Sequence, residues 1–366
     1  MDKIYTITIH RAINYGAVLQ AYGLHRYLKS QGYDVEIIDY RPKDLEYKKV
    51  HLWEYVTLKS LIRYSKVVLK FLIHPKLSGM KVKKFNSFCD KYFISTNKKY
   101  NGFKELINES WYGNIFICGS DQIWNSELTN GISKPYYLEF VPTGAKRVAY
   151  AASFGKDSIY EKEKPIIRGL ISKFDAISIR EDSGIEIAKQ LGIAATKVLD
   201  PAFLLTKDEW SKIANIPKYK NYLLIYKFGD EDIIEETYKK IAEKLKLKTV
   251  LISESMTGEK KVDFKANGTG PEEFLGLFMF ADFIVTNTFH GTAFSIIFEK
   301  NFVSVSHSDT DTRMTSLLDS LGIFDRFIKQ REDIDSISNS IDYIKVKQLL
   351  DKQKQQSFDF IEEVLK

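Results

Sequence analysis

Residues 4–40, IYTITIHRAINYGAVLQAYGLHRYLKSQGYDVEIIDY, decide the fold class of this chain of 366 residues. Residues 4–9 alternate apolar and polar side chains, as a half-buried strand does, and residues 35–40 form a second strand-like run. Residues 17–31 between them have helical periodicity and end at Gly32. The apolar residues on one face of that helix are Ala17, Val18, Ala21, Leu24 and Leu28. Strand, helix and strand at this spacing predict a βαβ unit with parallel strands.

The same alternation continues along the chain, so two α/β sheets in tandem are predicted, with a cleft between them. Further strands are expected at 114–119, 147–153, 176–180, 197–200, 222–228, 249–253, 283–287 and 301–306. Helices are expected at 181–192, 230–247, 271–281, 292–300 and 344–365. We expect an N-terminal Rossmann-like domain at 1–205 with a basic helical insertion at 45–108, and a C-terminal Rossmann-like domain at 206–343. The helix within 344–366 is expected to pack back on the first domain.

The composition, with 44% hydrophobic and 28% charged residues, is that of a soluble globular protein, and the length favours two domains. No apolar run approaches the roughly 20 residues that cross a bilayer. The first ten residues read as a strand and lack the features of a signal peptide. Cys89 and Cys118 lie in apolar or aromatic runs and are expected to be buried thiols. The predicted location is therefore the cytoplasm.

Much of the net charge of +6 comes from residues 47–84, where ten Lys and Arg residues are interleaved with aromatic ones. A solvated helical face is one interpretation of this segment. Peripheral contact with an anionic membrane surface or a phosphorylated substrate is another. Nucleic acid is a third, but no recognition motif accompanies the charge, so no nucleic-acid partner is predicted.

The strongest candidate site is the run TNTFHGTAF at 286–294, which contains His290. An apolar strand ends at Asn287, and a helix is expected to begin near Gly291 or Thr292. Ligands of open α/β sheets bind at the carboxyl ends of strands, and a helix start favours phosphate or carboxylate. The alternative is a histidine that only caps the helix. We take His290 as catalytic and the other members of the run as substrate-binding: Asn287, Thr288, Gly291 and Thr292.

Two other strand ends carry polar candidates. Arg180 ends an apolar strand, where a guanidinium could hold a carboxylate or phosphate through two bonds, or could pair with Glu181 or Asp182. The run GSDQIWN at 119–125 follows another strand and has groups that sugar sites use, although a structural turn is equally consistent with it. The candidates in that run are Ser120, Asp121, Gln122 and Trp124.

The first loop and a late helix start supply the remaining candidates. Asn14 and Gly16 precede a helix at the end of the first strand, and Arg313 begins an amphipathic helix. The pattern GxGxxG is absent, as are a Walker A loop, HExxH, paired CxxC and GxSxG. The other histidines show no metal-ligand spacing, so we expect chemistry without a metal or cofactor.

Seven segments together resemble the polysaccharide pyruvyl transferase family, in the order of that family. They are NYGAVLQAYGLHRYLKSQG (14–32), GSDQIWN (119–125), YAASFG (150–155), SIREDSG (178–184), VLDPAFLL (198–205), TNTFHGTAFSI (286–296) and TRMTSLLDSLGI (312–323). Any one of them is weak, but seven in order are specific. The basic insertion and the C-terminal tail carry no such segment. Many relatives have Asp at the position of Asn287 and Ser at that of Thr288.

The resemblance implies a fold similar to the GT-B glycosyltransferases, with two Rossmann-like domains. It also implies transfer of pyruvate from phosphoenolpyruvate to two hydroxyls of a sugar, which forms a cyclic ketal in surface polysaccharide biosynthesis, such as that of a capsule. His290 and Arg180 match the phosphoenolpyruvate-binding histidine and arginine of the family, and Arg313 would assist. The expected acceptor is a lipid-linked oligosaccharide at the inner membrane face. A GT-B glycosyltransferase that uses a sugar nucleotide is the alternative function, and a non-catalytic sugar-binding protein is a third.

Overall fold

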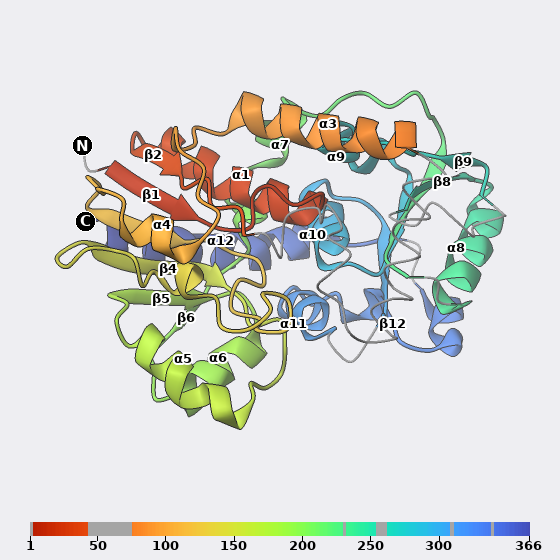
Figure 1. The fold of residues 1–366 in the computed structure, drawn as a ribbon. Coiled ribbons are helices and arrows are strands. Elements are labelled where there is room, and N and C mark those ends of the chain that lie inside the picture. The colour runs from red at the N-terminus through yellow and green to blue at the C-terminus, as the bar shows by residue number, and fades with distance from the viewer. Residues whose placement is uncertain (1–2, 43–74, 230–231, 254–261, 308–310, 338–339) are drawn as a thin grey trace, which may run out of the picture.

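The computed structural model describes residues 3–42, 75–229, 232–253, 262–307, 311–337 and 340–366, and it contains two parallel sheets (Figure 1). The first sheet consists of β1 (Lys3–Ile7), β2 (Asp34–Ile37), β3 (Ile115–Cys118), β4 (Lys146–Ala152), β5 (Ala176–Ile179) and β6 (Thr196–Lys197). The second consists of β7 (Tyr222–Lys227), β8 (Lys248–Ser253), β9 (Phe264–Lys265), β10 (Phe283–Thr286), β11 (Phe302–Val305) and β12 (Phe327–Ile328). The strand orders are β2-β1-β3-β4-β5-β6 and β12-β11-β10-β7-β8-β9.

The helices that cover the first sheet or precede the second are α1 (Tyr15–Ser30), α3 (Pro75–Tyr92), α4 (Phe103–Ile107), α5 (Lys164–Ile171), α6 (Asp182–Gln190) and α7 (Lys207–Ser211). Those that follow are α8 (Asp232–Leu245), α9 (Pro271–Phe280), α10 (Phe289–Ile297), α11 (Thr312–Ser320) and α12 (Tyr343–Leu365). The 3-10 turns are η1 (Lys134–Tyr137), η2 (Glu161–Glu163), η3 (Pro201–Leu204), η4 (Phe324–Arg326) and η5 (Arg331–Ser336). The predicted α/β class with two parallel sheets is confirmed.

Two of the differences between predicted and observed element bounds follow from a capping side chain. The expected strand at 197–200 ends at Lys197, since the Asp200 carboxylate accepts a hydrogen bond from Ala202 N and begins η3. The helix expected from residue 292 begins at Phe289, because Thr288 caps it through Gly291 N. The short strands β9 and β12 have two residues each and were not predicted. Most of the basic segment at 47–84 lies outside the described residues.

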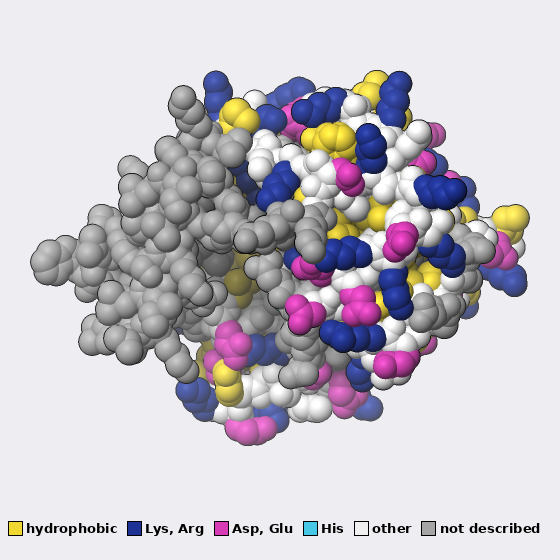
Figure 2. All heavy atoms as spheres, turned by 90° about the vertical axis from the view of Figure 1, so that its right-hand side faces the viewer, with side chains coloured by type: hydrophobic (Ala, Val, Ile, Leu, Met, Phe, Trp, Pro, Cys, Tyr) yellow, Lys and Arg dark blue, Asp and Glu magenta, His cyan; other side chains and the backbone are white. Residues whose placement is uncertain are grey.

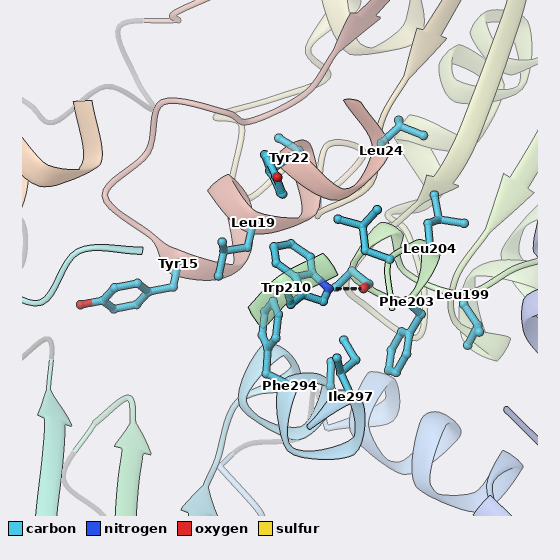
Figure 3. Packing of buried hydrophobic residues seen from close by; sticks show 14 of the residues in the cluster. Tyr15, Leu19, Tyr22, Leu24, Leu199, Phe203, Leu204, Trp210, Phe294 and Ile297 are labelled. Atoms are coloured by element: carbon cyan, nitrogen blue, oxygen red, sulfur yellow. Dashed lines mark hydrogen bonds between the residues drawn. The ribbon is translucent and has the colours of Figure 1, made fainter. Parts of the chain in front are cut away.

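One hydrophobic core joins the two sheets. Trp210 of α7 lies between Tyr22 of α1 and Phe294 of α10, with ring centroids 5.4 and 5.2 Å away, and its Nε1 donates to Ala202 O (Figure 3). Side chains from both sheets, such as Ile4 and Leu224, belong to the same buried cluster. The two sheets are therefore held by a continuous apolar interior as well as by the chain that links them.

Two helices reinforce this contact. The last helix, α12, packs back on the first half as predicted: Leu199 N donates to Ser357 Oγ, and Phe358 stacks on Tyr27. In Figure 1 it crosses the half that holds β1 to β6, and both chain ends lie at that side. The α3 helix runs along the top of the molecule toward α9, where Lys91 forms an ion pair of 2.9 Å with Glu272.

Cys89 and Cys118 are buried thiols, as predicted, and burial raises the pKa of Cys89 to about 12. Among the described helices, none combines the length and apolar character needed to span a bilayer. The described surface at the end that carries α8 and β8 mixes Lys and Arg with Asp and Glu, so neither sign dominates there (Figure 2).

Candidate functional site

The strand orders bring the two topological switch points of the molecule to one place. In the first sheet the order reverses between β1 and β3, and in the second between β7 and β10. Parallel α/β sheets bind ligands at the carboxyl ends of the strands beside such a reversal. Residues after all four strands line one pocket of about 130 Å³, among them Asn14, Asp121, Phe228 and His290. We call it the switch-point pocket.

His290 lies at the second position of α10, and its side chain is 10% exposed. Its Nε2 is buried 3.7 Å from Asp200 Oδ2 and has no hydrogen-bond partner among the described residues. The opposite side of the ring rests on Gly16, where a Cβ would lie 2.0 Å from Nδ1. The structure therefore puts Gly16 under the imidazole, where only a residue without a side chain fits.

Arg180 directly follows β5 and lies among three carboxylates. Its Nη1 donates to Asp200 Oδ2 at 2.6 Å, its Nε is 3.5 Å from Glu181 Oε2, and its Nη2 is 3.9 Å from Asp121 Oδ1. Burial disfavours the charge, but these carboxylates outweigh it and raise the pKa of Arg180. The ion pair with Glu181 that the sequence allowed is present, whereas Asp182 pairs with Lys197 instead.

Asp200 is the residue that connects Arg180 to His290. It was not among the site residues predicted from the sequence. Its side chain is fully buried and accepts a hydrogen bond of 3.0 Å from Ser120 Oγ. Burial raises the pKa of this carboxyl, but His290 and Arg180 outweigh burial and hold it well below its usual range. The available signal was an Asp-Pro pair just beyond a strand, the location of the other candidates.

Asp121, Gln122 and Arg313 meet at the mouth of this charge cluster. Asp121 has φ of 76°, a left-handed conformation that is uncommon for residues other than glycine. Both Nη atoms of Arg313 lie 3.3 Å from the Gln122 side-chain amide. Burial, together with the nearby charge of Arg180, lowers the pKa of Arg313 to about 10, so it stays a cation at neutral pH.

Four other candidates from the loop regions hold the backbone of the site. Asn14 Oδ1 accepts from Ala17 N and caps α1. The Asn287 amide accepts from Phe228 N and donates to Phe228 O, so it ties the loop after β10 to the loop after β7. An ionised Asp at 287 could not make the second of these bonds. Thr292 Oγ1 donates to Thr288 O within α10.

Gly291 and Trp124 lie away from the pocket surface. A Cβ on Gly291 would approach Thr286 Oγ1 to 2.1 Å, so close packing requires glycine there. Trp124 is buried, stacks on Tyr137 at 5.4 Å, and donates from Nε1 to Tyr136 O. Its indole face is thus covered by another ring instead of open to a sugar. Among the described residues, no group of three or more His, Cys, Asp or Glu side chains is arranged to hold a metal ion.

The comparisons with known proteins concern the family and the fold. The family model for polysaccharide pyruvyl transferases matches residues 14–309. Among the curated proteins, none matches the sequence. The solved S. aureus MnaA–UDP co-structure is similar to this chain with 10% identity and a TM-score of 0.52, and the match covers 98% of this chain and 91% of that one.

Two further solved structures are similar over nearly the whole chain. A putative UDP-N-acetylglucosamine 2-epimerase from Listeria monocytogenes has 10% identity and a TM-score of 0.48, with 97% and 90% of the two chains covered. The spinosyn rhamnosyltransferase SpnG has 8% identity and a TM-score of 0.45, with 100% and 96% covered. The likeness to MnaA shows the fold: two Rossmann-like domains of the GT-B type, as predicted from the sequence.

Proposed function

The chain belongs to the polysaccharide pyruvyl transferase family, and from this we propose that it transfers pyruvate from phosphoenolpyruvate to two hydroxyls of a sugar. The observation that carries the proposal is the meeting of His290, Asp200 and Arg180 at the joined switch points. A strongly charged donor requires cationic groups that are held in place, and proton transfer to carbon requires an acid within the same site. The cluster of His290, Asp200 and Arg180 offers a fixed cationic group and an acid.

The reaction assigns a role to each group. A proton moves to the methylene carbon of phosphoenolpyruvate, and C2 becomes electrophilic. A sugar hydroxyl adds to C2 and loses its proton, the bond from C2 to the phosphate oxygen breaks, and phosphate leaves with the electron pair. The second hydroxyl then adds to C2 and gives up its proton, which closes the ketal. His290 supplies and accepts protons, because an imidazole nitrogen can act as a general acid and as a general base.

Asp200 and the arginines serve the charges of this reaction. The Asp200 carboxylate, 3.7 Å from His290 Nε2, attracts the positive charge that the ring carries while it transfers a proton. Arg313 and the amino end of α10 face the anionic donor in the switch-point pocket, and Arg180 adds positive potential from the adjacent cluster. Asp121 and Gln122 have the acceptor and donor groups that sugar hydroxyls bind.

The test is mass spectrometry of candidate acceptors after incubation with phosphoenolpyruvate. Ketal formation adds about 70 Da, pyruvic acid less water, and releases phosphate only when donor and acceptor are both present. His290→Ala should lose roughly 10²–10⁴-fold in kcat. Arg180→Lys should raise KM for phosphoenolpyruvate, because lysine lacks the bidentate fork.

Two results would contradict the proposal. One is near-normal turnover in a folded His290→Ala protein. The other is calorimetric binding of a sugar nucleotide such as a UDP-sugar, with no response to phosphoenolpyruvate, which would favour the glycosyltransferase.

We further propose that the acceptor is a lipid-linked oligosaccharide at the cytoplasmic membrane face. Retention on vesicles with anionic lipid tests that part, and charge reversal within residues 47–84 should abolish it.

A further inference from the structure

Two buried polar residues, Thr8 and Gln20, have no part in the reaction described above. Thr8 directly follows β1, and Gln20 lies in α1, four residues after Gly16. Thr8 is 3% exposed and Gln20 is 0% exposed. Residues four apart lie on the same face of a helix, so Gln20 stands one turn behind the glycine that supports the His290 ring. Polar groups at this depth are costly unless they are hydrogen-bonded.

The hydrogen bonds of these two residues form a chain with a fixed direction. The Gln20 side chain donates from Nε2 to Ala17 O at 2.9 Å and to Thr8 Oγ1 at 3.0 Å. Because the Ala17 carbonyl can only accept, this end of the amide must be the nitrogen. Thr8 Oγ1 accepts from Gln20 and donates its own proton to Ser120 O, 2.8 Å away. The chain therefore has a single arrangement of protons.

The far end of the chain is the Asp200 carboxylate. Ser120, the second residue after β3, donates from Oγ to Asp200 Oδ2 at 3.0 Å, and this oxygen lies 3.7 Å from His290 Nε2. The neighbouring Gly119 packs against Thr8, because a Cβ on Gly119 would lie 3.0 Å from Thr8 Cβ. Thr8 thus holds the turn that carries Ser120 through close packing as well as through a hydrogen bond.

Together these contacts close a ring around the imidazole. One side of the His290 ring rests on Gly16, and Nε2 on the other side faces Asp200. Both supports belong to the first half of the molecule, and buried contacts connect one to the other. The residues of this connection are Gly16, Gln20, Thr8, Ser120 and Asp200.

The first turn of α1 is itself anchored to the second half. Tyr15 donates from its hydroxyl to Thr269 O at 2.8 Å, and its ring stacks on Phe274 with centroids 4.4 Å apart. This anchor does not involve Thr8 or Gln20. A disturbance at Thr8 should therefore move the turn that carries Ser120 and leave α1 in place.

The Gln20 amide is retained at a cost to stability. Its Oε1 atom is buried and has no hydrogen-bond partner among the described residues. An unpaired buried acceptor is unfavourable, and an apolar side chain of similar size would avoid that loss. Packing alone therefore does not account for glutamine at this position, which favours a role for its amide in the placement of other groups.

We propose that Thr8 and Gln20 are positioning residues that set the place of Asp200 relative to His290. They hold the turn that carries Ser120 at a fixed distance from α1, and neither belongs to the described lining of the switch-point pocket. Their effect on rate rests on the proposed function. Their effect on the surroundings of the imidazole does not, and it can be measured in a protein without activity.

Kinetics of valine and serine variants test the effect on rate. Thr8→Val removes the hydroxyl at nearly constant shape and should reduce kcat roughly 10–10²-fold, because a small displacement of a catalytic group has a large effect. The KM for phosphoenolpyruvate should change less than kcat, since Thr8 does not line the pocket. Thr8→Ser keeps the hydroxyl and should restore kcat.

Thr237→Val is the matched control for a buried valine in place of threonine. Thr237 lies in α8, is 0% exposed, and donates to a main-chain carbonyl, Ile233 O, at 2.7 Å, as Thr8 does to Ser120 O. It is not in the described lining of the switch-point pocket. Its kcat should stay close to that of the wild type.

Magnetic resonance of isotope-labelled histidine side chains tests the placement directly. The chain has six histidines, and His290→Ala identifies the His290 signal by its absence. Thr8→Val should shift the ring-nitrogen signals of His290, whereas Thr8→Ser and Thr237→Val should leave them in place. His10 reports on a purely local disturbance, because its Nδ1 lies 3.2 Å from Thr8 O.

An unchanged His290 signal in folded Thr8→Val protein would overturn the inference, with or without a shift at His10, because the disturbance would then end at Thr8. Wild-type kcat in that variant, or an equal loss in Thr237→Val, would overturn it as well. Circular dichroism checks each fold, and Gln20→Met, which removes the amide at similar size, takes the place of Thr8→Val if that protein does not fold. A shifted His290 signal in a protein that never forms a ketal would retain the positioning role and remove the proposed function.

Discussion

Asp200 determines the electrostatics around His290 and Arg180, because one carboxylate oxygen serves both. Oδ2 is 2.6 Å from Arg180 Nη1 and 3.7 Å from His290 Nε2. Oδ1 meanwhile accepts from Ala202 N and fixes the backbone that follows β6. A single buried side chain thus couples the position of its own loop to the two basic groups of the site.

Asp200→Asn should lower the free energy of unfolding by about 3 kcal/mol at pH 7, because it leaves the buried Arg180 with weaker compensation. The lowered pKa of Asp200 means that its contribution is fully present above the unfolded value of about 3.9 and is lost progressively as the pH falls from that value through the lower folded pKa. Urea unfolding at pH 7 and pH 3.5 should therefore show the gap between the two proteins beginning to narrow in acid. A gap that stays constant with pH would contradict this account.

At the residue level, the sequence showed which side chains stand at strand ends, but it did not show which side chains they would contact after folding. His290 and Arg180 stand at strand ends, so the pattern alone selected them. Asp200 became visible only when folding brought the start of η3 beside α10, 90 residues later in the chain. Trp124 follows a strand end in the same way, yet its ring packs on Tyr137, because side-chain direction after a strand depends on turn geometry that the pattern does not encode.

The elements that matter most for the site are α1 and α10, whose first turns meet across the two halves. Gly16 is the second residue of α1, and His290 is the second of α10. The distance of 2.0 Å from a Gly16 Cβ to Nδ1 shows how closely they approach. The alternation of strands and helices was readable from periodicity, but contacts between helices so far apart in the chain were not.

Gly16→Ala should displace the imidazole and reduce kcat by roughly 10²-fold, since a shift of about 1 Å can have that effect on a catalytic group. The clash with the imidazole should lower stability, and the helix preference of alanine over glycine, about 1 kcal/mol, offsets part of that loss. Gly169→Ala in α5 is the control, as its Cβ would meet nothing within 4 Å. Steady-state kinetics of both variants would test this, and equal activity of the two would refute the packing argument.

For the whole molecule, the decisive feature is the core that continues from one sheet to the other around Trp210. The sequence indicated two halves, because the strand pattern restarts at residue 222. It did not indicate that the halves share an interior, since apolar residues on α1, α7 and α10 have the same periodicity whether they face their own sheet or a neighbour.

The protein should therefore unfold in one cooperative transition. Far-ultraviolet circular dichroism, which follows the backbone, and tryptophan fluorescence, to which Trp210 in the shared core contributes with the three other tryptophans, should give coincident thermal curves. Leu19→Ala in the same core should shift both curves together to lower temperature, by a loss of about 2–5 kcal/mol. Two separated transitions would show that the halves are independent.

The return of α12 to the first half also constrains how the molecule can move. The chain passes from the first half to the second after Leu205 and comes back before Tyr343, so the halves are joined at two points. Two halves that are connected by two segments rotate most freely about the axis that passes through both segments. Relative motion of the two halves should therefore follow one axis, along which His290 and Asp200 would move apart or together.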